Sequence, residues 1–222
     1  MEIIARIKSD FPTKFAIPRQ SGILQNLESR IVFEGKYRNP DYIRGIEGFS
    51  HLWLIWCFSE NADKGSSPTV RPPRLGGNSR VGVFATRSPF RPNPIGLSSV
   101  RLVRTELCEE GICLVVTGAD LMDGTPIYDI KPYIPFSDSH PDALGGFSDE
   151  HISDSLSVAF SSDLPDSFPE EKKDSLLEIL RQDPRPSYHN DPERIYGFVF
   201  AGFEIRFKVD GKNLLVISVN RA

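Results

Sequence analysis

The sequence predicts a mainly β protein, α+β overall, in which a β-rich N-terminal domain precedes a small α+β domain. Short apolar or alternating segments bounded by Gly, Pro or Asn recur through the first two thirds of the 222 residues, without helical patterns between them. A helical pattern appears only near the C-terminus, before two further strand-like segments. Short strands without intervening helices are typical of a barrel or a sandwich, and both architectures are open at this point.

Seven segments of the N-terminal two thirds are expected to be strands, because each is apolar or alternating and ends at a turn residue. The run 52–58 does not alternate, so we expect both of its faces to be covered, by another subunit or by the second domain. The seven segments are 2–7, 30–34, 51–58, 81–84, 97–103, 112–117 and 127–130.

The last third predicts a smaller unit that is joined to the first by a linker. Residues 138–166 are rich in Ser, Asp, Gly and Pro, a composition typical of a connecting segment. We therefore expect domains over 1–137 and 167–222. The C-terminal elements expected are an amphipathic helix over 169–182 that stops before Pro184, and a hairpin of strands 196–209 and 213–219 across Asp210-Gly211-Lys212.

Composition places the chain among soluble globular proteins, with 39% hydrophobic and 25% charged residues. The longest apolar run is less than half of what a membrane-spanning helix requires, and the N-terminus lacks the apolar region of a signal peptide. We expect a cytoplasmic protein with no membrane partner. The three cysteines form no CxxC pair and the four histidines have no ligand spacing to them, so no metal site is expected.

The charge distribution favours a nucleic-acid partner, although the net charge of −4 alone argues against one. Residues 71–104 contain no Asp, Glu or Lys, so this segment carries +7 and the remainder of the chain carries −11. Its arginines are Arg71, Arg74, Arg80, Arg87, Arg91, Arg101 and Arg104. Such a concentration of guanidinium groups is what phosphate binding requires.

Four stretches are difficult to explain as structure alone. Neither a Rossmann nor a Walker phosphate-binding turn occurs, so any nucleotide site uses other loops. Between Pro89 and Pro94 three prolines fix the backbone, and stiff loops on a sheet commonly display binding residues. The four stretches are AIPRQSG (16–22), the strand end FSE (58–60), the loop 81–97 and ADLMDGTP (119–126).

In this order, these stretches resemble the TsaA-like (TrmO) family of tRNA N6-methyltransferases, over residues 3–136. The most specific part is ATRSPFRPNPIGLS (85–98), supported by GFSHLWLIWCF (48–58) and DLMDGTP (120–126). The segment DPRPSY (183–188) with the final hairpin is similar to the family's bacterial C-terminal domain.

The resemblance implies an antiparallel β-barrel that binds S-adenosylmethionine without a Rossmann fold and works as a homodimer. It implies that the substrate is N6-threonylcarbamoyladenosine at position 37, in the anticodon loop of tRNA, and that the product carries an N6-methyl group. Two other function classes stay open: a non-catalytic RNA-binding module that uses the arginine-rich loop, and an interaction protein whose loops build a dimer interface.

The resemblance also implies a set of site residues. Asp123 is the candidate catalytic base, and we expect it to meet Arg87 at one cavity. At Ser59 the chain departs from the family, which often has His there. The expected cofactor-binding residues are Pro18, Arg19, Gln20, Ser59, Glu60, Arg87, Leu97, Asp120, Leu121, Met122 and Asp123, and the expected RNA-binding residues are Arg71, Arg74, Arg91 and Asn93.

Overall fold

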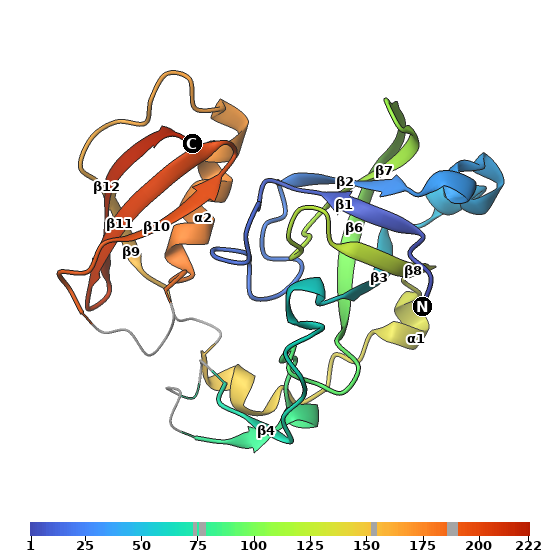
Figure 1. Cartoon of the computed structure of the whole chain (residues 1–222), viewed down its shortest axis with the longest axis horizontal. Coiled ribbons are helices and arrows are strands. Elements are labelled where there is room, and N and C mark those ends of the chain that lie inside the picture. The colour runs from blue at the N-terminus through green and yellow to red at the C-terminus, as the bar shows by residue number, and fades with distance from the viewer. Residues whose placement is uncertain (73–74, 76–78, 152–154, 186–190) are drawn as a thin grey trace.

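The structure, a computed structural model, describes residues 1–72, 75, 79–151, 155–185 and 191–222. Figure 1 shows two lobes, one built of the N-terminal strands and one of the C-terminal strands with helix α2. Each lobe has its own hydrophobic cluster of buried residues. Within the described part of the chain, no helix is long and apolar enough to cross a membrane.

Six antiparallel strands of the first lobe pair in a closed ring, in the order β1-β2-β7-β6-β3-β8. The first and last strands close it through the pairs Ala5↔Ile127 and Arg6↔Pro126. Alternate side chains point inward and form the core, among them Ile7, Leu54 and Leu114. The strands are β1 (Ala5–Lys8), β2 (Glu28–Phe33), β3 (His51–Cys57), β6 (Ile95–Cys108), β7 (Gly111–Thr117) and β8 (Pro126–Pro132).

The prediction of a strand over 81–84 is wrong for residues 83 and 84. Only β5 (Val81–Gly82) is extended, and it pairs with β4 (Thr69–Val70) outside the ring. The chain then turns through the 3-10 helix η6 (Val83–Ala85). Other short helices before the second lobe are η1 (Gly35–Arg38), η2 (Pro40–Ile43), η3 (Ile46–Gly48), η4 (Ser59–Asn61), α1 (Pro135–Asp138) and η7 (Gly146–His151).

Within this chain, strand β3 is fully covered on one face only, and the expected cover of its other face by another subunit stays a prediction. Leu52, Leu54 and Trp56 are buried in the ring, whereas Trp53 and Ile55 are half-buried on its outer face. The indole Nε1 of Trp53 donates a hydrogen bond of 2.9 Å to the carboxylate of Asp138. The Trp53 indole therefore has a polar partner on the face that this chain leaves half-covered.

The second lobe is a four-stranded sheet in the order β10-β11-β12-β9, packed against α2 (Lys173–Arg181), which the 3-10 helix η8 (Glu170–Lys172) precedes. Strand β9 lies within the expected linker and pairs in parallel with β12. The strand expected over 196–209 is divided in two, because Ala201 (φ 53°) and Gly202 (φ 79°) make a tight turn. The domain limits stay a prediction. The strands are β9 (Ser157–Phe160), β10 (Tyr196–Phe200), β11 (Phe203–Asp210) and β12 (Asn213–Arg221).

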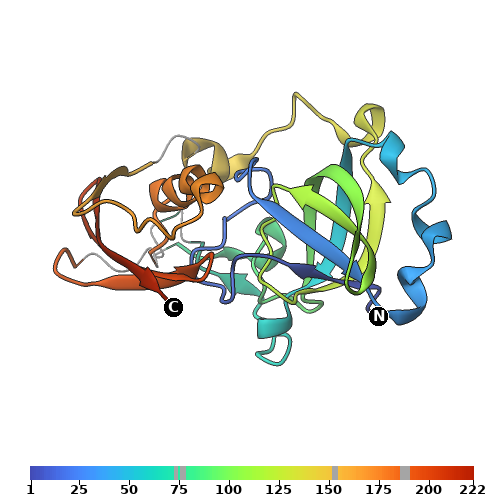
Figure 2. The ribbon, with the colours of Figure 1, turned by 90° about the horizontal axis from the view of Figure 1, so that it is seen from above.

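The loop between β1 and β2 belongs to the core of the second lobe. Phe11, Leu24 and Leu27 are buried in the same cluster as the inner face of α2, and the rings of Phe11 and Phe200 lie 5.6 Å apart. Lys172 Nζ adds an ion pair of 2.6 Å with Asp10. Figure 2 shows this blue loop extending from the ring towards the orange helix α2. The loop therefore fastens one lobe to the other.

Gly96 is required by the indole of Trp56, with which it pairs across β3 and β6. A Cβ at position 96 would lie 2.2 Å from Trp56 Cε2, so Gly96→Ala forces the buried ring to shift. We expect a loss of about 1–3 kcal/mol in the free energy of unfolding, measured in urea. Gly82→Ala is the control, because nothing lies within 4 Å of its added Cβ. Equal stability of the two variants would contradict this prediction.

Candidate functional site

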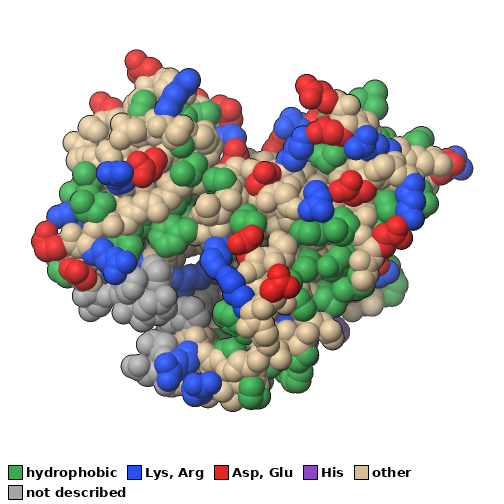
Figure 3. Space-filling view, in the orientation of Figure 1, with side chains coloured by type: hydrophobic (Ala, Val, Ile, Leu, Met, Phe, Trp, Pro, Cys, Tyr) green, Lys and Arg blue, Asp and Glu red, His purple; other side chains and the backbone are tan. Residues whose placement is uncertain are grey.

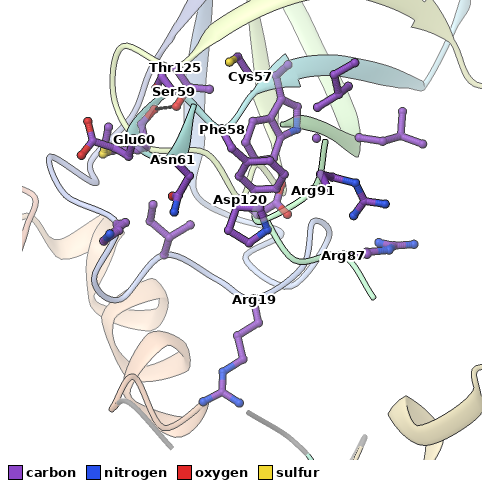
Figure 4. A pocket seen from close by; sticks show the side chains of 18 of the residues that line it. Arg19, Cys57, Phe58, Ser59, Glu60, Asn61, Arg87, Arg91, Asp120 and Thr125 are labelled. Atoms are coloured by element: carbon purple, nitrogen blue, oxygen red, sulfur yellow. Dashed lines mark hydrogen bonds between the residues drawn. The ribbon is translucent and has the colours of Figure 1, made fainter. Parts of the chain in front are cut away.

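A cavity of about 500 Å³ opens where the ends of β3 and β6 meet the loop that follows β1. This volume lies in the range of small-molecule sites. All four stretches singled out in the sequence contribute to it, and Figure 4 shows their side chains around the hollow. The lining residues are Lys14, Ile17, Pro18, Arg19, Gln20, Trp56, Cys57, Phe58, Ser59, Glu60, Asn61, Thr86, Arg87, Pro89, Arg91, Ile95, Gly96, Leu97, Asp120, Met122 and Thr125.

Two of the eleven expected cofactor residues do not line the cavity. Leu121 is 1% exposed and points into the ring core. Asp123 is exposed, and its Oδ1 accepts a hydrogen bond of 2.9 Å from the Ser9 N–H. The expected meeting of Asp123 with Arg87 is therefore not observed, because the Asp123 side chain fastens the end of β1. The nine that line the cavity are Pro18, Arg19, Gln20, Ser59, Glu60, Arg87, Leu97, Asp120 and Met122.

Asp120 is the aspartate of this turn that faces the cavity, and a short hydrogen-bond chain holds it. The Ser98 hydroxyl donates to Asp120 Oδ1 at 2.5 Å, and the indole N–H of Trp56 donates to Ser98 Oγ at 2.9 Å. Ser98 is fully buried. Burial raises the pKa of Asp120, and this effect outweighs the Ser98 hydrogen bond and the nearby charge of Arg87. The carboxylate is thus oriented and binds a proton more readily than an ordinary aspartate.

The aromatic side of the cavity depends on Gly96. Its missing side chain admits the indole of Trp56, whose ring meets Phe58 edge-on with centroids 4.3 Å apart. The sequence did not predict the hydrogen bonds that Trp56 and Ser98 make here. A signal was present, because Ser98 is a polar residue in phase with Val100 on the inward face of β6.

The segment Pro18-Arg19-Gln20-Ser21 is tied to three other parts of the molecule. Gln20 Oε1 accepts a hydrogen bond of 2.5 Å from Arg87 Nη1. Ser21 Oγ accepts one of 3.2 Å from the Ser99 N–H on β6. Arg19 Nη2 donates to the backbone carbonyl of Asp183 in the second lobe, at 3.0 Å. These bonds fix the outline of one cavity wall before any ligand binds.

The residues expected to contact RNA lie in different settings. Arg91 lines the cavity and donates to the carbonyls of Thr86 and Ser88 at 3.1 and 3.2 Å, so it also braces its own loop. Arg71 is exposed beside β4, whereas Asn93 is exposed but outside the lining. Arg74 lies outside the described residues.

The arginine-rich segment does not present all of its charge to one ligand. Arg104 binds Glu28 and Glu106, with distances of 2.6 and 2.9 Å, so its charge is compensated on the ring. Figure 3 shows Lys and Arg side chains in the hollow between the lobes and on the part of the molecule that carries β4. Of the described arginines of this segment, Arg87 and Arg91 line the cavity.

Comparison with protein families decides the relationship of this chain. The model of the tRNA-methyltransferase O N-terminal domain matches residues 6–139, and the model of the TrmO C-terminal domain matches residues 153–222. The chain belongs to the TrmO family. The resemblance drawn from the sequence motifs is confirmed for both halves of the chain.

Individual members of the TrmO family are similar over nearly the whole chain. The tRNA (adenine(37)-N6)-methyltransferase of Escherichia coli is 41% identical over 216 residues, which cover 94% of this chain and 92% of the relative. A Pseudomonas aeruginosa protein assigned by name to the S-adenosylmethionine-dependent methyltransferases is 39% identical over 202 residues. These residues cover 87% of this chain and 85% of the relative. A crystal structure of TrmO from Pseudomonas aeruginosa superposes with a TM-score of 0.78 and 30% identity, covering 99% of this chain and 95% of that one.

The raised pKa of Asp120 predicts how Asp120→Asn changes stability with pH. Below the ordinary value of 3.8 the carboxyl is protonated in both folded and unfolded chains, so its ionisation costs nothing. As the pH rises through the window up to the raised pKa, the unfolded chain ionises first and the folded protein loses stability. The Asp120→Asn variant has no carboxyl at this position and avoids this loss. Its free energy of unfolding should therefore rise relative to that of the native protein as the pH increases across the window.

Denaturant unfolding at several pH values between about 3 and 7 tests this sign. Asp138→Asn is the control of opposite sign, because hydrogen bonds from the Ile134 N–H and the Trp53 indole lower the pKa of Asp138. The stability that Asp138 contributes is present above the unfolded pKa and is lost as the pH falls. A relative stability of Asp120→Asn that falls with rising pH would show that Asp120 is not desolvated.

Proposed function

We propose that this protein is an S-adenosylmethionine-dependent methyltransferase that methylates N6 of threonylcarbamoyladenosine at position 37 of tRNA. One observation carries the proposal: the four stretches that resemble the family lie around a single cavity, in a chain that belongs to the TrmO family in both halves. The antiparallel ring then serves as the β-barrel scaffold of the cofactor site.

The cavity offers the groups that S-adenosylmethionine requires. Trp56, Phe58 and Leu97 supply an apolar wall on which an adenine can stack. Asp120 supplies an oriented acceptor for hydroxyl or amino groups, and Arg87 a donor for a carboxylate. A charge-assisted hydrogen bond of this kind is worth about 1.5–3 kcal/mol.

Methyl transfer to an amine depends on positioning more than on acid-base strength. S-adenosylmethionine, when bound, supplies a methyl group on a positively charged sulfur. The protein contributes the alignment of that methyl group with N6, and orientation of this kind can lower a barrier by about 7–11 kcal/mol. Asp120, whose pKa burial raises, is better suited than the exposed Asp123 to accept the proton that N6 releases.

The RNA side of the site uses the arginines near the cavity mouth. Bases of an anticodon loop are unpaired, so little free energy is needed to turn one into the cavity. Arg91 lies at the cavity and Arg71 on the neighbouring β4–β5 segment, where phosphates of the loop can reach them. We place the protein in the cytoplasm, where its substrate is made.

We propose further that the protein works as a homodimer through the outer face of β3 and its surroundings. Trp53 and Tyr133 pack against each other there, with ring centroids 5.5 Å apart. Ile134 and Phe136 follow, and Phe136 is 93% exposed. A cluster of aromatic side chains at a surface is typical of an interface.

The direct test of the function is mass spectrometry of nucleosides from tRNA incubated with the protein and a labelled methyl donor. Labelled N6-methyl-threonylcarbamoyladenosine is the expected product. Affinity for tRNA without any methylated nucleoside, and without binding of S-adenosylmethionine, would identify a non-catalytic RNA-binding module instead.

Substitutions of Arg87 and Arg71 should weaken the binding of different ligands. Arg87→Ala is expected to weaken S-adenosylmethionine binding tenfold or more, about 1.4 kcal/mol, in titration calorimetry. Arg71→Ala should leave that affinity unchanged, weaken tRNA binding and reduce the slope of log affinity against log salt by about 0.7. Normal cofactor binding by Arg87→Ala would show that Arg87 is misassigned.

Phe136→Asp should convert the dimer to a monomer in light scattering, because it places a charge within the proposed interface. Leu107→Asp is the control, since Leu107 is 85% exposed at the end of the β6–β7 hairpin, away from that face. If the native protein is monomeric, or if both variants behave alike, the interface is wrong.

A further inference from the structure

Arg19 is one of the side chains that attach the cavity wall to the second lobe. Arg19 lines the cavity, yet its Nη2 donates to the carbonyl of Asp183, 164 positions further along the chain. Figure 4 shows Arg19 extending away from Asp120 towards the loop that follows α2. A residue of the expected cofactor segment is thus held by the C-terminal part of the chain.

Asp183 has an unusual backbone conformation that directs this carbonyl. Its φ is 50°, in the left-handed region that few residues other than glycine adopt. Its N–H donates to the Leu180 carbonyl at 3.3 Å, which ends α2, and Pro184 prevents the helix from resuming. The direction of the Asp183 carbonyl is therefore set by the end of a helix whose inner face is buried.

Arg185 holds Asp183 in place. Its Nε and Nη2 donate to the two carboxylate oxygens of Asp183 at 2.8 and 2.9 Å. The Arg185 side chain is 11% exposed and that of Asp183 is 32% exposed, so the pair is partly shielded from water. A two-pronged guanidinium–carboxylate pair fixes geometry as well as charge, which a single contact does not.

We propose that Asp183 and Arg185 are positioning residues of the cofactor site that act through Arg19. This inference rests on the proposed function, because it assumes that the cavity binds S-adenosylmethionine. An unattached arginine samples many rotamers and loses that freedom when a ligand binds. Arg185 orders Asp183 and Asp183 orders Arg19 in advance, so the second lobe raises the affinity of a cavity built mainly by the first.

The packing of the loop between β1 and β2 also indicates that the second lobe positions the cavity wall. Residues on both sides of Arg19, Ala16 and Leu24 among them, are buried in the cluster that includes Leu176 and Leu180 of α2. Movement of α2 would therefore displace the whole segment that carries Pro18, Arg19 and Gln20. The contact between Arg19 and Asp183 couples the cavity to a structure that is already tightly packed.

A double-mutant cycle on the full-length protein tests the proposal. Arg185→Ala and Arg19→Ala are each expected to raise the Kd for S-adenosylmethionine about tenfold, with a matching rise in KM for the methyl donor. Because Asp183 and Arg185 do not touch the reacting atoms, kcat at saturating donor should stay within about twofold. The double variant should bind no more weakly than Arg19→Ala, since Arg185 acts through Arg19.

Arg206→Ala is the matched control, because Arg206 also pairs with a carboxylate two positions earlier in the same lobe, on an exposed sheet face. Arg185→Lys keeps the charge but not the two-pronged geometry, so it should show much of the loss, and it replaces Arg185→Ala in the cycle if that variant does not fold. Native affinity in the Arg185 variants, with only reduced unfolding stability, overturns the proposal, as do losses that multiply in the double variant. A native protein that binds no S-adenosylmethionine overturns the proposed function itself.

Discussion

The loop between β1 and β2 is the constraint on which the site depends, because it is fixed to both lobes at once. Towards the ring, the Gly22 N–H donates to the Gly118 carbonyl at 2.8 Å, and Asp123 holds the start of the loop. At Gly118 a Cβ would lie 3.1 Å from Gly22 Cα, so the close approach of the two backbones depends on glycine at position 118. Towards the second lobe, Phe11 and Leu27 are buried in its core. The segment that carries Pro18, Arg19 and Gln20 lies between these anchors and has little freedom to move.

Inside the cavity, the main electrostatic feature is the burial of the Asp120 carboxyl. Desolvation makes its charge costly, and the chain from Trp56 through Ser98 offsets part of that cost with an oriented donor. Donors and acceptors that are fixed before the ligand arrives need no reorganisation during the reaction, which is the main way in which proteins stabilise charged transition states. The ring supplies this rigidity, because Ser98 and Trp56 lie on paired strands.

Much of this architecture was accessible from the sequence, for reasons that are local. The alternation of apolar residues predicts strands such as β1 and β7 because the side-chain period of a strand is two. The same rule says less about β3, whose apolar run does not alternate and whose outer face is half-buried within this chain. It also gave no indication of β9, whose four residues become a strand only by pairing in parallel with β12.

The candidate site, too, was only partly predictable from the sequence. The four stretches could be assigned to one cavity from their resemblance to the TrmO family, but the choice between Asp120 and Asp123 could not be made. The two aspartates are chemically identical and three positions apart, and only the path of the turn decides that one faces Ser98 and the other Ser9. The link from Arg19 to Asp183 was equally inaccessible, because no local pattern relates residues so far apart in the chain. Sequence motifs identify which groups a site contains, whereas the contacts that orient those groups come from whichever lobe packs behind them.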